Sequence, residues 1–333
     1  MRHKYSIINF LVRTPGSDSF TAASKARTDI DQIARNNGIG VFNIKVCEGK
    51  NRFVTQMSIL IALVRTLMRC ERVIVQYPPL IGLRLLHLVN TLFRKKIVYL
   101  IHDIEFLRFG RDSKNEISKL NKADALICHT PNMAVTLKNN GLIRPLVNLY
   151  LFDYLSESVS HEDRSSSVVF AGSLKKAGFL RMLNKIGNVH FSLYGIFFED
   201  NMGGNNVEYC GKFLPEKIGV LNGKYGLVWD GDSLDTCSGD FGKYLHYNSS
   251  HKISLYIRAK LPLIVWRDSS LADFVIKNKI GIAVSSLEYL DNELRKVDDS
   301  TYSELVSNIS CLAEKLGNGQ MFLSALKKID DQL

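Results

Sequence analysis

Polar side chains follow an apolar strand of the sequence at a point where they could act on a substrate hydroxyl. His102 and Asp103 come directly after the apolar run 97–101. A carboxylate beside an imidazole could serve as a general base or hold a substrate hydroxyl. The alternative is that Asp103 caps the next helix by accepting a backbone N–H. We favour the catalytic interpretation because the pair ends a strand.

A glycine turn followed by two lysines forms a second candidate. Residues 168–172 are apolar and end at Gly172, and Lys175 and Lys176 follow shortly after. Glycine lets the backbone approach a phosphate closely, the start of a helix offers N–H groups, and lysine adds positive charge. The run is neither G-x-G-x-x-G nor a P-loop, which disfavours dinucleotide dehydrogenases and Walker-type ATPases.

A third candidate combines an acidic loop with a polar helix start. The apolar run 225–229 precedes Asp230 and Asp232, and the sequence N-S-S-H-K at 248–252 precedes the amphipathic segment 253–258. Polar residues and a lysine at a helix start suit a phosphate or a sugar hydroxyl. The two aspartates could bind a metal, but loop carboxylates are more often turn formers, so we expect a metal-free site. A hydrolase is unsupported, because the sequence has neither a Ser-His-Asp order nor H-E-x-x-H.

Strands and helices must alternate along the chain to position these residues. Short continuous apolar runs separated by amphipathic segments are typical of parallel sheets covered by helices on both faces. The expected strands are 6–10, 40–46, 73–77, 96–102, 125–129, 168–172, 190–195, 207–211, 226–229, 262–266 and 281–284, and the expected helices include 22–36, 53–70, 132–139, 252–258 and 270–278. We therefore predict an α/β fold with two doubly wound, Rossmann-like domains that bind ligands in the cleft between them.

The length of the chain predicts two domains. Its 333 residues exceed the ~250–300 that one hydrophobic core usually serves. The polar segment 156–167 is the natural linker. We expect an acceptor-binding domain at 1–155 and a donor-binding domain at 165–314, with a C-terminal helix at 315–333 that packs back on the first domain.

Charge is distributed unevenly along a chain of ordinary globular composition. Hydrophobic residues make up 46% and charged residues 23%. Residues 1–150 hold 23 Lys and Arg against 10 Asp and Glu, which indicates a phosphate-bearing substrate, an acidic lipid or a nucleic acid as partner, or simply a solvated basic surface. Nucleic acid is least favoured because no recognition motif appears. The basic segment 80–96 could lie on an anionic membrane surface or be a core-facing helix with a basic C-terminus.

The cysteines and the N-terminus point to the cytoplasm. Six cysteines lie far apart, with no metal-binding spacing, and no secretory signal begins the chain. Segments 53–70 and 80–93 are interrupted by Arg or His, so neither is expected to span a membrane. We expect reduced thiols and a cytoplasmic protein.

The loop 225–245, with the sequence YGLVWDGDSLDTCSGDFGKYL, resembles the bacterial β-1,6-galactofuranosyltransferases of O-antigen and polysaccharide biosynthesis. Shorter matching runs are K-A-R at 25–27, L-I-H-D-I at 100–104, F-D-Y at 152–154, H-K at 251–252, L-A-D-F at 271–274 and I-G at 280–281. The chain is similar, more distantly, to the streptococcal adhesin glucosyltransferases. The resemblance covers nearly the whole chain.

This resemblance implies a GT-B fold, with the acceptor on the first domain and a UDP-sugar on the second. The residues implied for UDP are Gly172, Lys176, Lys212, Phe213, Asp230, Asn248, Ser249, Ser250, His251 and Lys252, and those implied for the acceptor are Thr21, Ala22, Ala23, Lys25 and Arg27. Gly172 and Lys176 would lie at the diphosphate, and Lys252 would be its main cation. The Glu-x7-Glu pattern of many retaining GT-B enzymes is missing, and Asp230 or Asp240 could take that role.

The reaction implied is inverting transfer of galactofuranose from UDP-galactofuranose to a sugar hydroxyl of an oligosaccharide linked to a lipid diphosphate, without a metal. Asp103 would be the base, with His102 orienting it and Glu105 as second choice. The alternatives are a UDP-glucose-dependent enzyme acting on GlcNAc of a glycoprotein or glycolipid, and a non-catalytic glycan- or nucleotide-binding subunit. We expect no cofactor beyond the donor, no nucleic acid, peripheral contact with the anionic inner membrane, and possible self-association.

Overall fold

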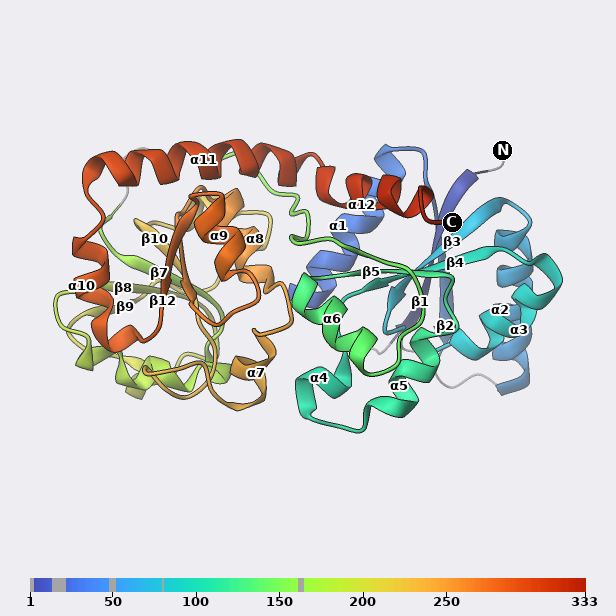
Figure 1. Cartoon of the computed structure of the whole chain (residues 1–333), viewed down its shortest axis with the longest axis horizontal. Coiled ribbons are helices and arrows are strands. Elements are labelled where there is room, and N and C mark those ends of the chain that lie inside the picture. Colours follow the sequence, from blue (N-terminus) through green and yellow to red (C-terminus); the bar gives the residue numbers. More distant parts are fainter. Residues whose placement is uncertain (1–2, 14–21, 48–51, 80, 161–164) are drawn as a thin grey trace.

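Two parallel sheets, one in each half of the chain, form the framework of the protein (Figure 1). The computed structural model describes residues 3–13, 22–47, 52–79, 81–160 and 165–333. Helices cover both faces of each sheet, and every pairing between the named strands is parallel. The predicted α/β architecture of two Rossmann-like domains is confirmed.

The first sheet has the strand order β2-β1-β3-β4-β5-β6. Its elements along the chain are β1 (His3–Arg13), α1 (Ala22–Asn36), β2 (Gly40–Cys47), α2 (Arg52–Leu67), β3 (Cys70–Tyr77), α3 (Leu83–Phe93), β4 (Lys96–Ile101), α4 (Glu105–Phe109), α5 (Ser113–Leu120), β5 (Ala125–Cys128), α6 (Pro131–Asn139) and β6 (Leu146–Asn148). The central strands are buried on both faces, as their unbroken apolar sequences predict.

The second sheet has the order β12-β11-β10-β7-β8-β9. Its strands are β7 (Val168–Ser173), β8 (Phe191–Ile196), β9 (Val207–Tyr209), β10 (Tyr225–Val228), β11 (Leu263–Trp266) and β12 (Gly281–Val284). Its α-helices are α7 (Gly239–Tyr244), α8 (His251–Arg258), α9 (Ala272–Lys277), α10 (Leu290–Arg295) and α11 (Asp299–Gly317). Short 3-10 segments replace a long helix between β7 and β8.

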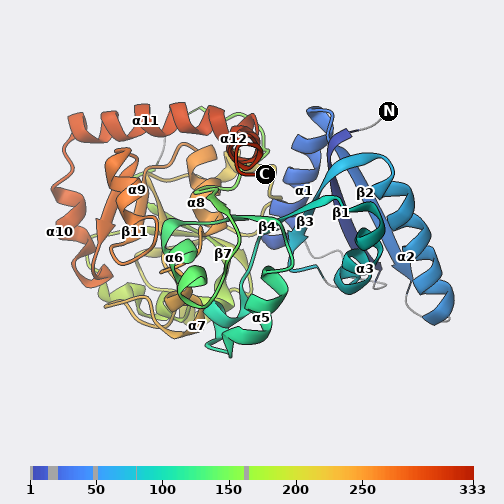
Figure 2. The same ribbon diagram turned by 45° about the vertical axis from the view of Figure 1, so that its right-hand side comes forward.

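The last helix, α12 (Gln320–Asp330), returns to the first domain (Figures 1 and 2). Its buried side chains, among them Phe322 and Ile329, share a core with Ile30 of α1 and Ile74 of β3. Asp153 lies where the chain crosses between the domains, and it accepts the backbone N–H groups of Met321 and Phe322 at the start of α12. The two domains are therefore tied together by a crossing segment and a returning helix.

Several element boundaries differ from the sequence-based expectations. The helix expected at 53–70 ends at Leu67, because Cys70 already pairs with His3 in the sheet. The short edge strand β6 was not predicted. The segment expected at 80–96 contains a shorter helix, α3, which ends where Arg94 adopts a left-handed conformation, and Lys96 begins β4. Among the described residues no helix is long and apolar enough to cross a membrane.

Candidate functional site

The carboxyl edges of the two sheets meet at a pocket of about 210 Å³. Because all strands in each sheet are parallel, the residues that follow them gather at one edge. The first domain contributes Ala26, His102, Asp103, Arg108, His129 and Phe152, and the second contributes Asp230, Phe241, Tyr244, Asn248, Ser249, Ser250 and His251. The structure thus brings the predicted catalytic pair and five of the ten predicted UDP-binding residues to one pocket.

Asp103 is held by two groups of its own domain. One carboxylate oxygen accepts the backbone N–H of Ile104 at 3.1 Å, and the other is paired with the Arg108 guanidinium. The carboxylate remains about one quarter exposed, so a substrate can reach it. Asp103 does not cap α4, whose N-cap residue is Ile104 and whose first N–H groups are accepted by Glu116, so the capping alternative is wrong and Asp103 lies in the pocket lining.

His102 does not touch Asp103, contrary to the expectation that it orients the carboxylate. Its Nε2 lies 2.7 Å from Oε1 of Gln76, and its ring stacks on Phe152 with centroids 5.2 Å apart. Burial holds the pKa of His102 well below its usual value, so the ring is neutral and donates to Gln76. The ring of His102 therefore forms part of the pocket wall beside Asp103 and does not hydrogen-bond to its carboxylate.

Two further histidines complete a neutral wall. His129 Nε2 donates to the carbonyl of Ile101 at 3.0 Å, and its Nδ1 accepts the N–H of Ser249 at 3.1 Å. Burial lowers the pKa of His129 to about 4 and that of His251 to about 3. His129 was not predicted as a site residue, although it follows an apolar strand just as His102 does, and the same rule could have found it.

The start of α8 carries side-chain atoms that find no partner. Asn248 Oδ1, Ser249 Oγ and His251 Nε2 are buried without a hydrogen bond to any described residue. Buried polar atoms are normally satisfied, so these three are available for hydrogen bonds to a polar molecule in the pocket. The helix itself begins at His251 after Ser250, whose side chain does not cap it, and its first N–H groups face an anion favourably.

A lysine and an aspartate adjoin this helix start. Lys252 Nζ lies 2.6 Å from Asp230 Oδ1, and each side chain is only about one sixth exposed. The lysine also lies against Gly172, because a Cβ added to that glycine would meet Lys252 Cε at 3.4 Å. The predicted neighbourhood of Gly172, Asp230 and Lys252 is thus present, and the two further ammonium protons of Lys252 can bind an anion.

The ends of β7 and β8 approach each other too closely for side chains. A Cβ on Gly195 would lie 1.8 Å from the carbonyl oxygen of Gly172, and the N–H of Gly195 donates to the carbonyl of Gly211 at 2.9 Å. Lys212 and Phe213 come next along the chain. They do not line the pocket between the domains; Lys212 is exposed, and Phe213 packs edge-on against Tyr194.

Helix α7 reaches across from the second domain. Two cations lie over the ring of Phe241. The Lys176 ammonium of the second domain is 4.9 Å from the ring centroid, and the Arg108 guanidinium of the first domain is 5.0 Å from it. The hydroxyl of Tyr244 accepts the N–H of Ile104 at 3.0 Å. Arg108, Phe241 and Tyr244 were not predicted as site residues, although Phe241 and Tyr244 belong to the run 225–245 that carries the family resemblance. No local pattern marks Arg108.

Four of the five expected acceptor residues lie on the first helix, α1. Thr21 lies outside the described residues, and Ala22 and Ala23 begin α1. Lys25 is only 6% exposed and pairs with Asp29 at 2.6 Å, so it has a structural role.

Arg27 donates to the carbonyls of Gln76 and Pro78 at 2.8 and 2.9 Å, and it supports the end of β3. Glu105, the second choice as base, is half exposed and pairs with Arg111 at 3.2 Å, outside the pocket lining. The geometry therefore favours Asp103 over Glu105 as the group that meets a substrate.

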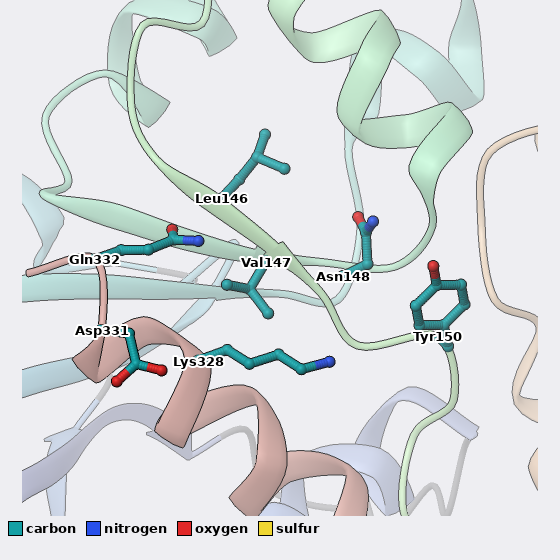
Figure 3. A pocket seen from close by; sticks show the side chains of 7 residues that line it. All are labelled: Leu146, Val147, Asn148, Tyr150, Lys328, Asp331 and Gln332. Atoms are coloured by element: carbon teal, nitrogen blue, oxygen red, sulfur yellow. The ribbon is translucent and has the colours of Figure 1, made fainter.

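A hollow of about 380 Å³ lies between β6 and α12 (Figure 3). It is lined by Leu146, Val147, Asn148, Tyr150, Lys328, Asp331 and Gln332. Val147 points toward the helix, whereas Leu146 and Asn148 point to the other side of the strand. None of the predicted site residues line it, and we do not assign it to the reaction.

Comparison with known proteins places the chain among glycosyltransferases. Residues 4–151 match the family model described as Glucosyltransferase 3-like, N-terminal domain, and residues 168–329 match the corresponding C-terminal domain. The Escherichia coli (strain K12) protein named beta-1,6-galactofuranosyltransferase WbbI is 32% identical over 323 residues, which cover 94% of this chain and 95% of the relative. The resemblance stated from the sequence is confirmed.

Two solved structures show the same fold at low identity. Anabaena Alr3699/HepE, solved with UDP and glucose, has a TM-score of 0.59 and 11% identity, and the match covers both chains completely. The lipopolysaccharide outer core galactosyltransferase WaaB in its apo form also gives 0.59 and 11%, over 97% of this chain and 99% of that one. The predicted GT-B fold is confirmed.

Proposed function

Because the chain belongs to the glucosyltransferase 3-like family and is a hexosyltransferase, we propose that it transfers galactofuranose from UDP-galactofuranose to a sugar hydroxyl with inversion. The observation that carries this proposal is the pocket between the domains, which is lined both by the Asp103 carboxylate and by the start of α8 with its unpartnered polar side chains. Similarity to the E. coli relative along nearly its whole length supports the choice of sugar.

The donor diphosphate would bind at the start of α8. The first N–H groups of that helix, the Lys252 ammonium and the hydroxyls of Ser249 and Ser250 offer donors to phosphate oxygens. Gly172 leaves room for the diphosphate beside Lys252. These groups supply the positive charge that the leaving UDP needs, which supports a reaction without a metal.

Asp103 would act as the general base. The acceptor oxygen attacks C1 of the sugar as its proton passes to the carboxylate, the new C–O bond forms, and the bond from C1 to the phosphate oxygen breaks. Arg108 must first leave Asp103, because its guanidinium occupies one of the two oxygens that could take the proton. Arg108 lines the pocket and its Nε is buried without a described partner, so a bound diphosphate could recruit it.

The acceptor would be an oligosaccharide carried on a lipid diphosphate at the cytoplasmic face of the inner membrane, and contact with that membrane would be peripheral. The excess of Lys and Arg in residues 1–150 supports an anionic surface or acceptor on that domain.

A second candidate is glucosyl transfer from UDP-glucose to GlcNAc of a glycoprotein or glycolipid. The family model that matches both halves of the chain is named for a glucosyltransferase, which favours this alternative. Both candidates use the same pocket and the same base, so only the donor and the acceptor distinguish them.

The first experiment measures UDP release by the purified protein with UDP-galactofuranose, UDP-galactose and UDP-glucose, each in the presence of EDTA and a range of oligosaccharide acceptors. Turnover of the furanose donor alone supports the proposal. Turnover of UDP-glucose moves the protein to the second candidate. UDP binding with no turnover of any donor contradicts both and indicates a binding subunit.

The role of the base is tested by Asp103→Asn at saturating donor. We expect turnover to fall by about 10²–10⁴ with UDP affinity unchanged. The matched control is Asp112→Asn, which alters an aspartate of the same domain outside the pocket lining, where Asp112 caps α5 by accepting the N–H of Lys114 at 3.2 Å. If Asp103→Asn keeps most of its turnover, the assignment of the base is wrong.

A further inference from the structure

Helices α2 and α3 expose large apolar side chains on the face opposite the core. The exposed residues are Val54, Met57, Ile61 and Met68 on or just after α2, and Leu88 and Leu92 on α3. Leu92 is 82% exposed and Leu88 is 66% exposed. The same helices also bury Leu63, Leu86 and Val89 against the sheet, so they are apolar on two sides. A helix on the surface of a globular protein is normally polar on its outer side.

Arginines surround these side chains. Arg65, Arg69, Arg84 and Arg94 are exposed, and none of them forms an ion pair with a described residue. The sequence from 52 to 96 contains eight Lys and Arg and only one acidic residue, Glu71.

Two other cations of this stretch of sequence form ion pairs. Lys96 is 3.1 Å from Asp124, and Arg72 is paired with Asp330. We call the surface formed by the six apolar side chains and the four arginines the α2/α3 face. Its charge is strongly positive and its centre is apolar.

The α2/α3 face begins at the edge of the sheet that holds the candidate site. Strand β2 precedes α2 and strand β3 precedes α3, so both helices start near the carboxyl edge and run away from it. Gln76, near the end of β3, binds His102 in the pocket wall. Figures 1 and 2 show α2 and α3 together at the end of the first domain that is remote from the second.

We infer that the α2/α3 face binds the surface of an anionic lipid bilayer. Leu88, Leu92 and the apolar side chains of α2 enter the boundary between head groups and acyl chains, and the arginines bind lipid phosphates. This inference rests on the proposed function only for its purpose, because a bilayer held there would keep the enzyme at the surface that carries a lipid-linked acceptor.

A second copy of the chain is a poorer occupant. A symmetric dimer would place the same face against itself, and four unpaired arginines from each copy would then be brought together. Like charges brought together across an interface oppose association, whereas anionic head groups neutralise them.

The test is flotation of the full-length protein with vesicles of phosphatidylcholine and phosphatidylglycerol in equal parts, compared with phosphatidylcholine alone. We expect binding to the anionic vesicles that weakens at high salt. The double variant Leu88→Ser/Leu92→Ser should lower the partition coefficient at least about tenfold. The variant Arg65→Gln/Arg69→Gln should lower it about fivefold for each arginine.

The matched control is Val135→Ser/Ile143→Ser, which removes two similarly exposed apolar side chains, 58% and 77%, elsewhere on the same domain. Its binding should equal that of the wild type. The inference is overturned if the control and the Leu88/Leu92 variant lose vesicle binding equally. It is also overturned if the wild type does not bind anionic vesicles. A wild-type dimer that Leu88→Ser/Leu92→Ser converts to a monomer overturns it in favour of self-association.

UDP release with a soluble acceptor, measured on the same preparations, separates this inference from the proposed function. The surface variants should keep wild-type turnover with that acceptor. Turnover without vesicle binding refutes the membrane face alone, and vesicle binding without turnover of any donor supports it while the proposed function fails.

Discussion

Replacing Asp153 with asparagine should remove one contribution that lowers the stability of the protein as the pH rises. Asp153 is 1% exposed, and its carboxylate accepts the N–H groups of Met321 and Phe322 at 3.0 and 2.7 Å. Those hydrogen bonds favour the charged form, but burial opposes it more strongly and raises the pKa of Asp153 to about 7. The start of α12 is thus held by a carboxyl group that costs free energy to ionise.

The direction and size of the effect follow from the pKa values of the folded and unfolded states. An aspartate in the unfolded chain has a pKa of about 3.9, so between that value and about 7 the folded state binds the additional proton. Folding stability therefore falls as the pH rises through this window. From pH 5 to pH 8 the loss due to this one group is about 3 kcal/mol.

Asparagine has nearly the same shape and does not titrate. It keeps one oxygen for Phe322 but loses the second acceptor, which costs about 1 kcal/mol at every pH. The stability of Asp153→Asn relative to wild type should therefore rise by about 3 kcal/mol from pH 5 to pH 8. Both proteins carry the same buried histidines, so the pH-dependent contributions of the histidines cancel when the stability of the variant is compared with that of the wild type.

The assay is urea unfolding followed by circular dichroism at several pH values between 5 and 8. The control is Asp298→Asn at the start of α11, where an exposed carboxylate accepts the N–H of Thr301 at 2.7 Å and has a lowered pKa. Its difference from wild type should be flat across this range, because Asp298 is ionised in both states there. If the difference in free energy of unfolding between Asp153→Asn and wild type is also constant from pH 5 to pH 8, the wild-type Asp153 carboxylate ionises without a cost in stability, and the reasoning is wrong.

Three further changes probe the donor side and the domain contact. Lys252→Met removes the main cation at the start of α8 and should lower turnover by about 10²–10³, measured as UDP release; an unchanged rate would exclude a role at the leaving group. Gly195→Ala places a Cβ 1.8 Å from the Gly172 oxygen and should lower the free energy of unfolding by about 3 kcal/mol, whereas Gly187→Ala, with nothing within 4 Å, should be close to neutral in the same denaturation experiment. Phe241→Leu removes the ring between two cations of opposite domains, and small-angle scattering should then show a more open average arrangement of the domains; an unchanged profile would mean that the ring does not hold the cleft closed.

The strands could be predicted closely because their signal is local. The segment expected at 40–46 is β2 (Gly40–Cys47), and the segment expected at 96–102 is β4 (Lys96–Ile101). A strand buried on both faces must be apolar at consecutive positions, and that pattern is visible in the sequence itself. Strand β6 has three residues and lies at a sheet edge, so it leaves no such pattern.

The fold class, most of the strands and the polar residues that follow them could be predicted from the sequence, because parallel strands bring the residues after them to one edge of the sheet. Tertiary structure alone decided which of those residues face the pocket and which bind the protein itself. Lys25 looked suited to an acceptor but is buried against Asp29, and Asp103 gained Arg108 as a partner. The contact between Ile104 and Tyr244 joins positions 140 residues apart, and such partners are set by the packing of one domain on another rather than by any local spacing.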